Sequence, residues 1–246
     1  MTQLPGQMTN RWQDRAEPRA GQGMLYWHIL LGESPQVRAL ASIAREKLAP
    51  FSGLHFTPMR WLHVTTLAVG LMDDFTEAEI GNMAAHARDF LRDIPPVTVV
   101  LGKILYHPEA ITLAIGPAGV LDTVHDAISA AADGTPGMSK KTTRRELWIP
   151  HVTLAYSTTA QPAAPIIATL GRRLPEHTIS VDCVSLVIQE GAERLWNWQP
   201  IAKVLLGAPA EDGLQNHLPR GHLGFVQAGG TFIGDGGCTM SARWVV

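Results

Sequence analysis

The sequence predicts an α+β fold of two similar β-α-β-α-β halves, residues 24–106 and 110–206, forming two pseudo-symmetric lobes around a central cleft. Antiparallel or mixed sheets are expected in both lobes. The first observation behind this prediction is a repeated tripeptide: His-Val-Thr occurs at positions 63–65 and again at positions 151–153, 88 residues later. Both copies lie in apolar, β-branched runs, which is the pattern of a buried strand.

The second observation is that the elements around the tripeptide repeat at nearly the same interval. A strand begins near Met24 and another near Ala110, while a helix begins near Thr76 and another near Pro162. Each of these two pairs is 86 residues apart. An interval shared by several elements is better evidence of a duplication than a three-residue motif alone.

The first half is predicted to run strand, helix, strand, helix, strand. Ser34 and Pro35 are typical of a helix N-cap and first helical position, and Pro50 ends that helix. Thr76 and Glu79 have the spacing of a capping box and begin the second helix. The three strands are expected at residues 24–31, from the first motif to residue 70, and at 97–106.

The second half is predicted to repeat this order and to add a final strand. Its elements are a strand at 111–115, a helix with buried positions between 120 and 128, a polar loop at 133–146, the second motif strand, a short helix at 165–170, and strands at 179–189 and 195–206. The last two strands are expected to pair as a hairpin across residues 190–194.

Both ends of the sequence are predicted to lie outside the core. Residues 1–22 show no periodicity and are expected to form a flexible leader. Residues 207–246 hold nine of the 23 glycines and are expected to form a disordered tail, with a lid over the cleft as the alternative. Deleting both segments is expected to leave a folded, active protein. The leader lacks the apolar segment of a signal peptide, and no run reaches the length of a membrane span.

Composition limits the classes of function. A hydrophobic fraction of 46% in 246 residues supports a substantial core. Cys183 and Cys238 lie far apart in no metal-binding spacing, which indicates a reduced, cytoplasmic protein. A net charge of -2 argues against binding an extended duplex nucleic acid, which requires many phosphate contacts. A small or terminal phosphate remains a compatible substrate, and the protein is expected to be a monomer without a membrane partner.

The two motif strands form the candidate site. Side chains alternate between the faces of a strand, so His63 and Thr65 share one face, as do His151 and Thr153. The valine between them then faces the helices in each copy, which leaves the histidines and threonines toward a groove where the two repeats meet. A lone His-x-Thr is usually structural, but two copies in matching strands favour a functional site.

This pair of motifs suits acid-base chemistry at a phosphate. One imidazole can be neutral while the other is protonated, so one takes a proton from the attacking oxygen and the other gives one to the leaving oxygen. The two threonine hydroxyls would hold the non-bridging oxygens. No metal and no cofactor is expected, because the sequence places no carboxylate beside either histidine.

Other residues are weaker candidates. Trp61 shares the face of the first histidine and is a candidate for stacking on a base, with packing at the rim equally open. Trp148 is expected in the core. His28, on a neighbouring strand, is expected to support the site or to be structural, with substrate contact as the alternative. Tyr156 follows the second motif and is a possible substrate contact. The basic run at 140–145 is expected to be a solvated loop, with steering of phosphates as the alternative.

The paired His-Val-Thr strands, the duplicated halves and the overall size resemble the 2H phosphoesterase superfamily, over about residues 24–206. That superfamily includes RNA 2′,3′-cyclic phosphodiesterases and proteins called 2′-5′ RNA ligases. The resemblance implies a bilobal fold and metal-independent cleavage of a 2′,3′-cyclic phosphate or 2′-5′ phosphodiester of RNA ends or nucleotides. It also implies catalytic roles for His63 and His151 and phosphate-binding roles for Thr65 and Thr153.

Two positions depart from that family pattern. Many bacterial members carry an arginine shortly after the second motif, where this chain has Tyr156, and an aliphatic residue is common at the position of Thr66. These departures bear on the substrate more than on the chemistry. The alternative function is a non-catalytic RNA-end or nucleotide-binding protein that uses the same cleft, and a scaffold with structural histidines is a third.

Overall fold

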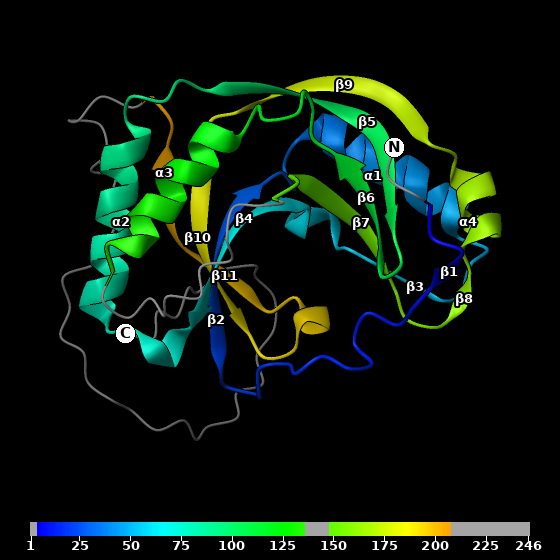
Figure 1. Cartoon of the computed structure of the whole chain (residues 1–246), viewed down its shortest axis with the longest axis horizontal. Coiled ribbons are helices and arrows are strands. Elements are labelled where there is room, and N and C mark those ends of the chain that lie inside the picture. Colours follow the sequence, from blue (N-terminus) through cyan, green and yellow to red (C-terminus); the bar gives the residue numbers. More distant parts are fainter. Residues whose placement is uncertain (1–3, 136–147, 208–246) are drawn as a thin grey trace, which may run out of the picture. The chain divides into compact units, whose positions relative to one another are not determined.

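The computed structural model describes residues 4–135 and 148–207 and confirms the predicted α+β class (Figure 1). The helices are α1 (Pro35–Leu48), α2 (Glu77–Leu91), α3 (Asp122–Asp133) and α4 (Ala163–Leu170). The strands are β1 (Gln7–Met8), β2 (Gly23–Leu30), β3 (Leu54–Phe56), β4 (His63–Leu71), β5 (Val97–His107), β6 (Ala110–Ala114), β7 (His151–Ser157), β8 (Gln161–Pro162), β9 (Arg173–Val181), β10 (Cys183–Glu190) and β11 (Trp198–Leu205).

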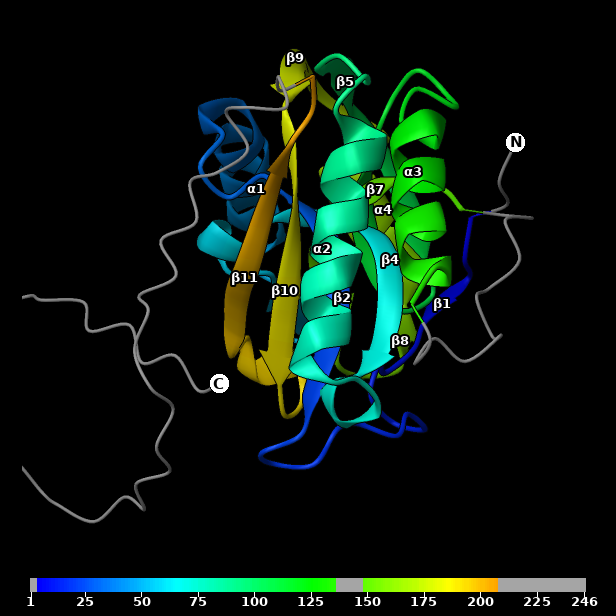
Figure 2. The same cartoon turned by 90° about the vertical axis from the view of Figure 1, so that its left-hand side faces the viewer.

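Nine of the strands form one antiparallel hydrogen-bonded path with two lobes, and β1 and β8 form a separate two-stranded sheet. The order along the path is β11-β10-β2-β4-β7-β6-β5-β9, and β3 adds to β7. The first lobe, β11 to β4, is covered by α2 and α3, while α1 and α4 lie on the second lobe, β7 to β9 (Figures 1 and 2). The lobes join where β4 pairs with β7, so the two motif strands lie at the centre of the path.

The two halves of the sequence do not each form one lobe. Helix α1 follows β2 but packs against β9, and α3 follows β6 but packs against β4. The C-terminal strands β10 and β11 complete the first lobe by pairing β10 with β2. Each lobe therefore takes elements from both halves, because α1 and α3 each pack on strands of the other half.

The prediction of a single strand at 179–189 is wrong, because the chain forms two strands there, with Asp182 between them. Val181 pairs with Val97 in the second lobe, whereas Cys183 pairs with Leu205 in the first lobe. The chain thus crosses between the lobes at this residue. The mainly apolar run at 179–189 does not reveal such a crossing, because the segments on both sides of Asp182 have a similar composition.

The predicted helix starts are confirmed at the atomic level. Ser34 Oγ accepts a hydrogen bond from the Val37 backbone N–H at 3.4 Å. Thr76 and Glu79 form the reciprocal capping box, in which each side chain bonds the backbone N–H of the other residue. The short strand β3 was not expected from the sequence, and the final strand begins at Trp198 after a 3-10 turn at Glu193–Leu195.

The N-terminal segment is packed, so the expectation of a flexible leader is wrong for residues 7–12. Strand β1 pairs with β8, and the Met8 side chain is 0% exposed in the main core. The backbone N–H groups of Thr9 and Arg11 donate to the carbonyls of Pro108 and Ser157, at 2.8 and 2.9 Å. This segment shows no sequence period because it packs through single side chains and not through one face of an element.

Replacing Met8 with alanine is therefore expected to lower the free energy of unfolding by about 2–5 kcal/mol, the usual cost of truncating a buried methionine. Urea denaturation followed by circular dichroism measures it. The matched control is Gln7→Ala, at the exposed neighbouring position of the same strand, for which a change within about 0.5 kcal/mol is expected. A Met8→Ala protein as stable as this control would show that the segment adds nothing to the fold.

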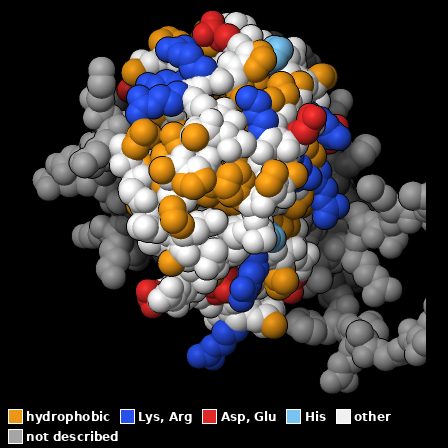
Figure 3. Space-filling model, turned by 90° about the vertical axis from the view of Figure 1, so that its right-hand side faces the viewer, with side chains coloured by type: hydrophobic (Ala, Val, Ile, Leu, Met, Phe, Trp, Pro, Cys, Tyr) orange, Lys and Arg blue, Asp and Glu red, His pale blue; other side chains and the backbone are white. Residues whose placement is uncertain are grey.

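On the face that carries α4, hydrophobic side chains gather near the centre, with Lys and Arg side chains around them (Figure 3). No helix in the described part of the chain has both the length and the apolar character to cross a membrane. The basic run at 140–145 and the tail at 208–246 lie outside the described residues.

Candidate active site

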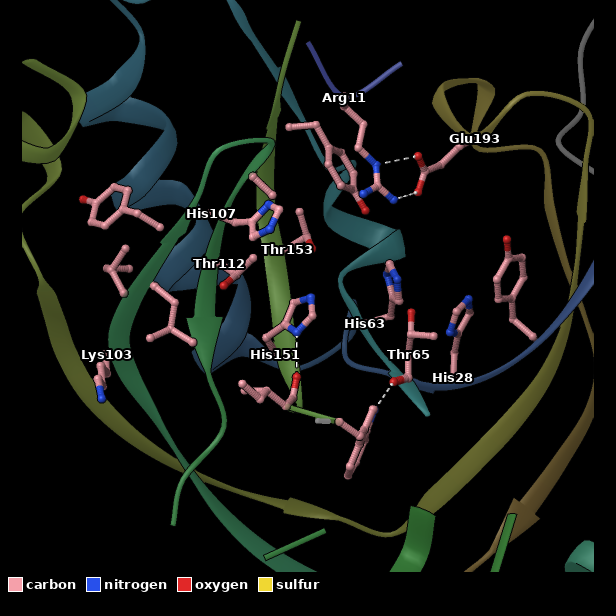
Figure 4. A pocket seen from close by; sticks show the side chains of 18 of the residues that line it. Arg11, His28, His63, Thr65, Lys103, His107, Thr112, His151, Thr153 and Glu193 are labelled. Carbon is pink, nitrogen blue, oxygen red and sulfur yellow. Dashed lines mark hydrogen bonds and ion pairs between the residues drawn. The ribbon is translucent and has the colours of Figure 1, made fainter. Parts of the chain in front are cut away.

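The two motifs open into one cleft between the lobes, with a volume of about 780 Å³ (Figure 4). Both histidines and both threonines of the motifs line it, as the sequence predicts. The valines between them, Val64 and Val152, are 1% and 0% exposed in the main core. The alternation of strand side chains therefore separates the core from the cleft in both copies.

The two motif strands are opposed directly. Val64 pairs with Val152 in antiparallel register. This register sets His63 across from Thr153 and Thr65 across from His151. Each histidine thus faces the threonine of the other motif, which gives the cleft a local two-fold arrangement of imidazole and hydroxyl groups.

The histidine rings are held in the same way. The Nδ1 atom of His63 lies 2.7 Å from the Trp61 carbonyl oxygen, and that of His151 lies 2.7 Å from the Ile149 carbonyl oxygen. A carbonyl oxygen can only accept, so each Nδ1 carries the hydrogen and donates it. The neutral form of each ring then has an unprotonated Nε2, the nitrogen that remains for proton transfer.

The environments of the two histidines differ. His63 is 7% exposed, and burial lowers its pKa to about 4, with a smaller contribution from the charge of His151. The Trp61 carbonyl opposes this shift only in part. His151, in contrast, is exposed at the start of β7. The structure therefore holds His63 as a neutral imidazole and leaves His151 open to solvent.

His28 lies beside His63, on the neighbouring strand β2. Its ring is 2% exposed and stacks between Tyr26 and Trp198, with the centre of the His63 ring 4.4 Å away. Neither ring nitrogen has a hydrogen-bond partner among the described residues. Burial first, and then the neighbouring His63, lower the pKa of His28 well below its ordinary value. His28 is thus a neutral ring at the wall of the cleft.

Each threonine has a neighbour that also lines the cleft. On the first lobe, Thr65 pairs with His28 across β4 and β2. On the second lobe, Thr153 pairs with Thr112 across β7 and β6. Thr112 is 6% exposed and was missed from the sequence, since a lone threonine in a short strand gives no signal of its own.

Within the described residues, no group of three His, Cys, Asp or Glu side chains is placed to hold a metal ion.

The two tryptophans take different positions. Trp61 does not line the cleft but packs at the rim, with its ring centre 5.5 Å from that of Trp198, so the packing alternative holds for it. Trp148 packs partly against the main core, as expected, but it also lines the cleft. Its indole Nε1 donates to the Thr65 carbonyl at 3.0 Å, which ties the second motif strand to the first.

One end of the cleft is closed by Arg11, which was missed because the N-terminal segment has no sequence pattern. Its guanidinium makes a bidentate bond with Glu193, at 3.1 and 3.0 Å, and a third bond with Glu109 at 3.1 Å. It also lies 4.9 Å from the centre of the ring of Tyr156, a buried residue that lines the cleft. Arg11 therefore bridges the turns of both lobes, and its charge is offset by two carboxylates.

Comparisons with known proteins agree with this fold. The family model described as the 2′-5′ RNA ligase superfamily matches residues 32–193. No curated protein matches the chain in sequence. Among solved structures, TT0787 of Thermus thermophilus matches with a TM-score of 0.53 at 21% identity, covering 75% of this chain and 98% of that one.

Two further structures share the fold. E. coli LigT complexed with NADP+ gives a TM-score of 0.58 at 16% identity, covering 76% of this chain and 99% of that one. The MHV ns2 PDE domain gives 0.50 at 12% identity, covering 68% and 98%. The family match, on a chain that shares this fold, defines it as a 2H phosphoesterase. The family match covers more than half of the sequence, and the chain belongs to the 2′-5′ RNA ligase superfamily.

Proposed function

We propose that this chain cleaves a 2′,3′-cyclic phosphate, or a related 2′-5′ phosphodiester, of an RNA end or a nucleotide. The observation that carries the proposal is the matched pair of imidazoles in one cleft, each with its Nδ1 fixed on a carbonyl and its Nε2 left for proton transfer. A binding protein would not need two such groups. The complexes of E. coli LigT with 3′-AMP, ATP and NADP+ support a nucleotide as the ligand.

In the proposed mechanism, His63 is the general base and His151 is the general acid. The neutral Nε2 of His63 takes a proton from water as the water oxygen attacks phosphorus. The bond from phosphorus to one ribose oxygen breaks, and His151 gives that oxygen a proton. Thr65 and Thr153 donate to the non-bridging oxygens as negative charge grows on them. The product is a monophosphate, and both histidines regain their starting protonation through solvent.

The low-pH limb of kcat/KM tests this assignment. Because burial lowers the pKa of His63 to about 4, the base is lost only when pH falls through that value. The acidic limb is therefore expected with a midpoint near pH 4, well below the ordinary range of a histidine. The measurement is the initial rate at low substrate concentration from pH 3.5 to 9, in buffers of constant ionic strength. An acidic limb above pH 6 would contradict His63 as the base.

A substrate panel tests the activity itself. The purified full-length chain is incubated in EDTA with 2′,3′-cyclic mononucleotides, an RNA oligonucleotide ending in a 2′,3′-cyclic phosphate and a 2′-5′-linked dinucleotide. Chromatography against 2′- and 3′-monophosphate standards identifies the product. We expect turnover to one isomer at a rate that EDTA does not change. Nucleotide binding without product from any substrate would instead support the binding protein, and loss of activity in EDTA would contradict the metal-independent mechanism.

A further inference from the structure

Three basic side chains line the wall of the cleft on the second lobe, away from the catalytic histidines. They are Lys103 on β5 and Arg172 and Arg173 at the start of β9, and all three are exposed. Across residues 4–135 and 148–207, no ion pair joins any of them to a carboxylate. Their positive charge therefore faces the cleft without a protein partner in the described structure.

The strand register fixes where this charge lies. Ala114 pairs with His151, the register of β5 and β6 sets Lys103 beside Ala114, and Lys103 pairs with Arg173. Directly opposed residues of neighbouring strands point to the same face. The Cα atom of Lys103 is thus two strand spacings from that of His151, about 10 Å, and Arg173 is three spacings away, about 14 Å. Figure 4 shows Lys103 on the opposite side of the cleft from Glu193.

The chain folds locally so that both arginines reach this wall. Gly171 ends α4 with a φ of 81°, in the left-handed region that glycine adopts without strain. Its carbonyl accepts a hydrogen bond from the hydroxyl of Tyr106 on β5. This bond fixes the turn against β5, so Arg172 and Arg173 follow directly at the edge of the cleft.

The opposite end of the cleft does not offer an unpaired cation to a second phosphate. The guanidinium of Arg11 is occupied by Glu193 and Glu109, whose carboxylates repel a second phosphate. The cleft is therefore electrostatically polarised, with paired charges at the Arg11 end and unpaired cations at the other. A substrate with its scissile phosphate between His63 and His151 is favoured when its further negative charge extends toward Lys103.

We propose that Lys103, Arg172 and Arg173 form a second anion subsite, which binds a phosphate of the substrate other than the one that is cleaved. This inference rests on the proposed function and narrows its substrate. Lys103 lies about 10 Å from His151 between Cα atoms, so the phosphate it binds is distinct from the scissile one and is the next phosphate of the same substrate. It is either a terminal phosphate of a mononucleotide or the next phosphodiester of an RNA chain.

The test compares three substrates that share one scissile bond. They are adenosine 2′,3′-cyclic phosphate, the same compound with a 5′-phosphate, and a dinucleotide that ends in adenosine 2′,3′-cyclic phosphate. For the wild-type chain we expect kcat/KM to be about tenfold higher when a second phosphate is present, the size expected from a few exposed charge pairs. The last two substrates distinguish a terminal phosphate from a phosphodiester.

The double variant Lys103→Ala/Arg173→Ala is expected to lose this tenfold advantage and to keep the wild-type kcat/KM, within about threefold, on the substrate without a second phosphate. The matched control is Lys47→Ala, an exposed lysine on α1 outside the cleft, which should change none of the three rates. Equal wild-type rates on all three substrates, or an advantage that the double variant keeps, would overturn the subsite and leave the proposed function intact.

A binding measurement keeps the subsite testable if no substrate is cleaved, which would count against the proposed function alone. Calorimetry with the wild-type chain is expected to show adenosine 3′,5′-bisphosphate binding about tenfold tighter than 3′-AMP, and the double variant is expected to bind both equally. Equal affinity of the wild-type chain for the two ligands would overturn the subsite without reference to turnover.

Discussion

Replacing His151 with alanine is expected to lower kcat by about 10²- to 10⁴-fold, the usual contribution of a positioned acid or base. In the proposed mechanism, this change leaves the ribose oxygen to depart without a proton. His63→Ala is expected to cost a similar factor, because the attacking water then loses its base. Initial rates at saturating substrate, on the most active member of the substrate panel, measure both losses.

The two substitutions are expected to differ in their effect on the free energy of unfolding, and this difference provides the control. His151 is exposed, so His151→Ala should keep the wild-type free energy of unfolding within about 0.5 kcal/mol. His63 is buried between the lobes, so His63→Asn, which fills more of the space, accompanies His63→Ala. A folded His151→Ala protein that turns over at the wild-type rate would reduce the second motif to a structural repeat of the first.

The second large effect is expected from the threonines. In the proposed mechanism, Thr65→Val and Thr153→Val each remove a hydroxyl that donates to a non-bridging oxygen, while nearly keeping the shape of the side chain. Removing one such donor is expected to lower kcat by about 10²- to 10³-fold, with a smaller change in KM, because the bond strengthens as charge develops. Steady-state kinetics over a wide range of substrate concentration separate the two parameters.

The chain offers a matched control for this prediction in the same strand. Thr66 follows Thr65, is 2% exposed, and its hydroxyl has no hydrogen-bond partner among the described residues. Thr66→Val makes the same chemical change away from the cleft, and it should leave kcat unchanged and the fold at least as stable, since an unsatisfied buried hydroxyl is removed. Equal losses from Thr65→Val and Thr66→Val would show that the effect comes from the strand and not from the cleft.

The sequence predicts the two motif strands and the cleft between them because the rules that apply there are local. Alternation along β4 and β7 separates Val64 and Val152 from the polar residues beside them, and both valines are buried while their neighbours line the cleft. The helix caps at Ser34 and Thr76 are likewise local, since each depends on residues within one turn. Local rules also predict the α+β class, because they recover the order of most elements.

The parts that the sequence does not predict depend on contacts between distant segments. Arg11 reaches the cleft from a segment whose strand β1 pairs with β8, and no local pattern in the sequence indicates that pairing. The break at Asp182 separates strands that belong to different lobes. The packing of α1 and α3 on strands of the other half is also not predicted from the sequence. The apolar face of an amphipathic helix indicates that the helix packs on a sheet, but it does not indicate which sheet.

The central claim is that His63 and His151 act together on one phosphate, and a double-mutant cycle tests it most directly. The four proteins are wild type, His63→Ala, His151→Ala and the double variant, and kcat is measured for each on the same cyclic phosphate. Groups that act as a unit are not additive, so the double variant is expected to be within about tenfold of the slower single variant. Losses that multiply, so that the double variant is slower by the full product of the two factors, would contradict a shared site.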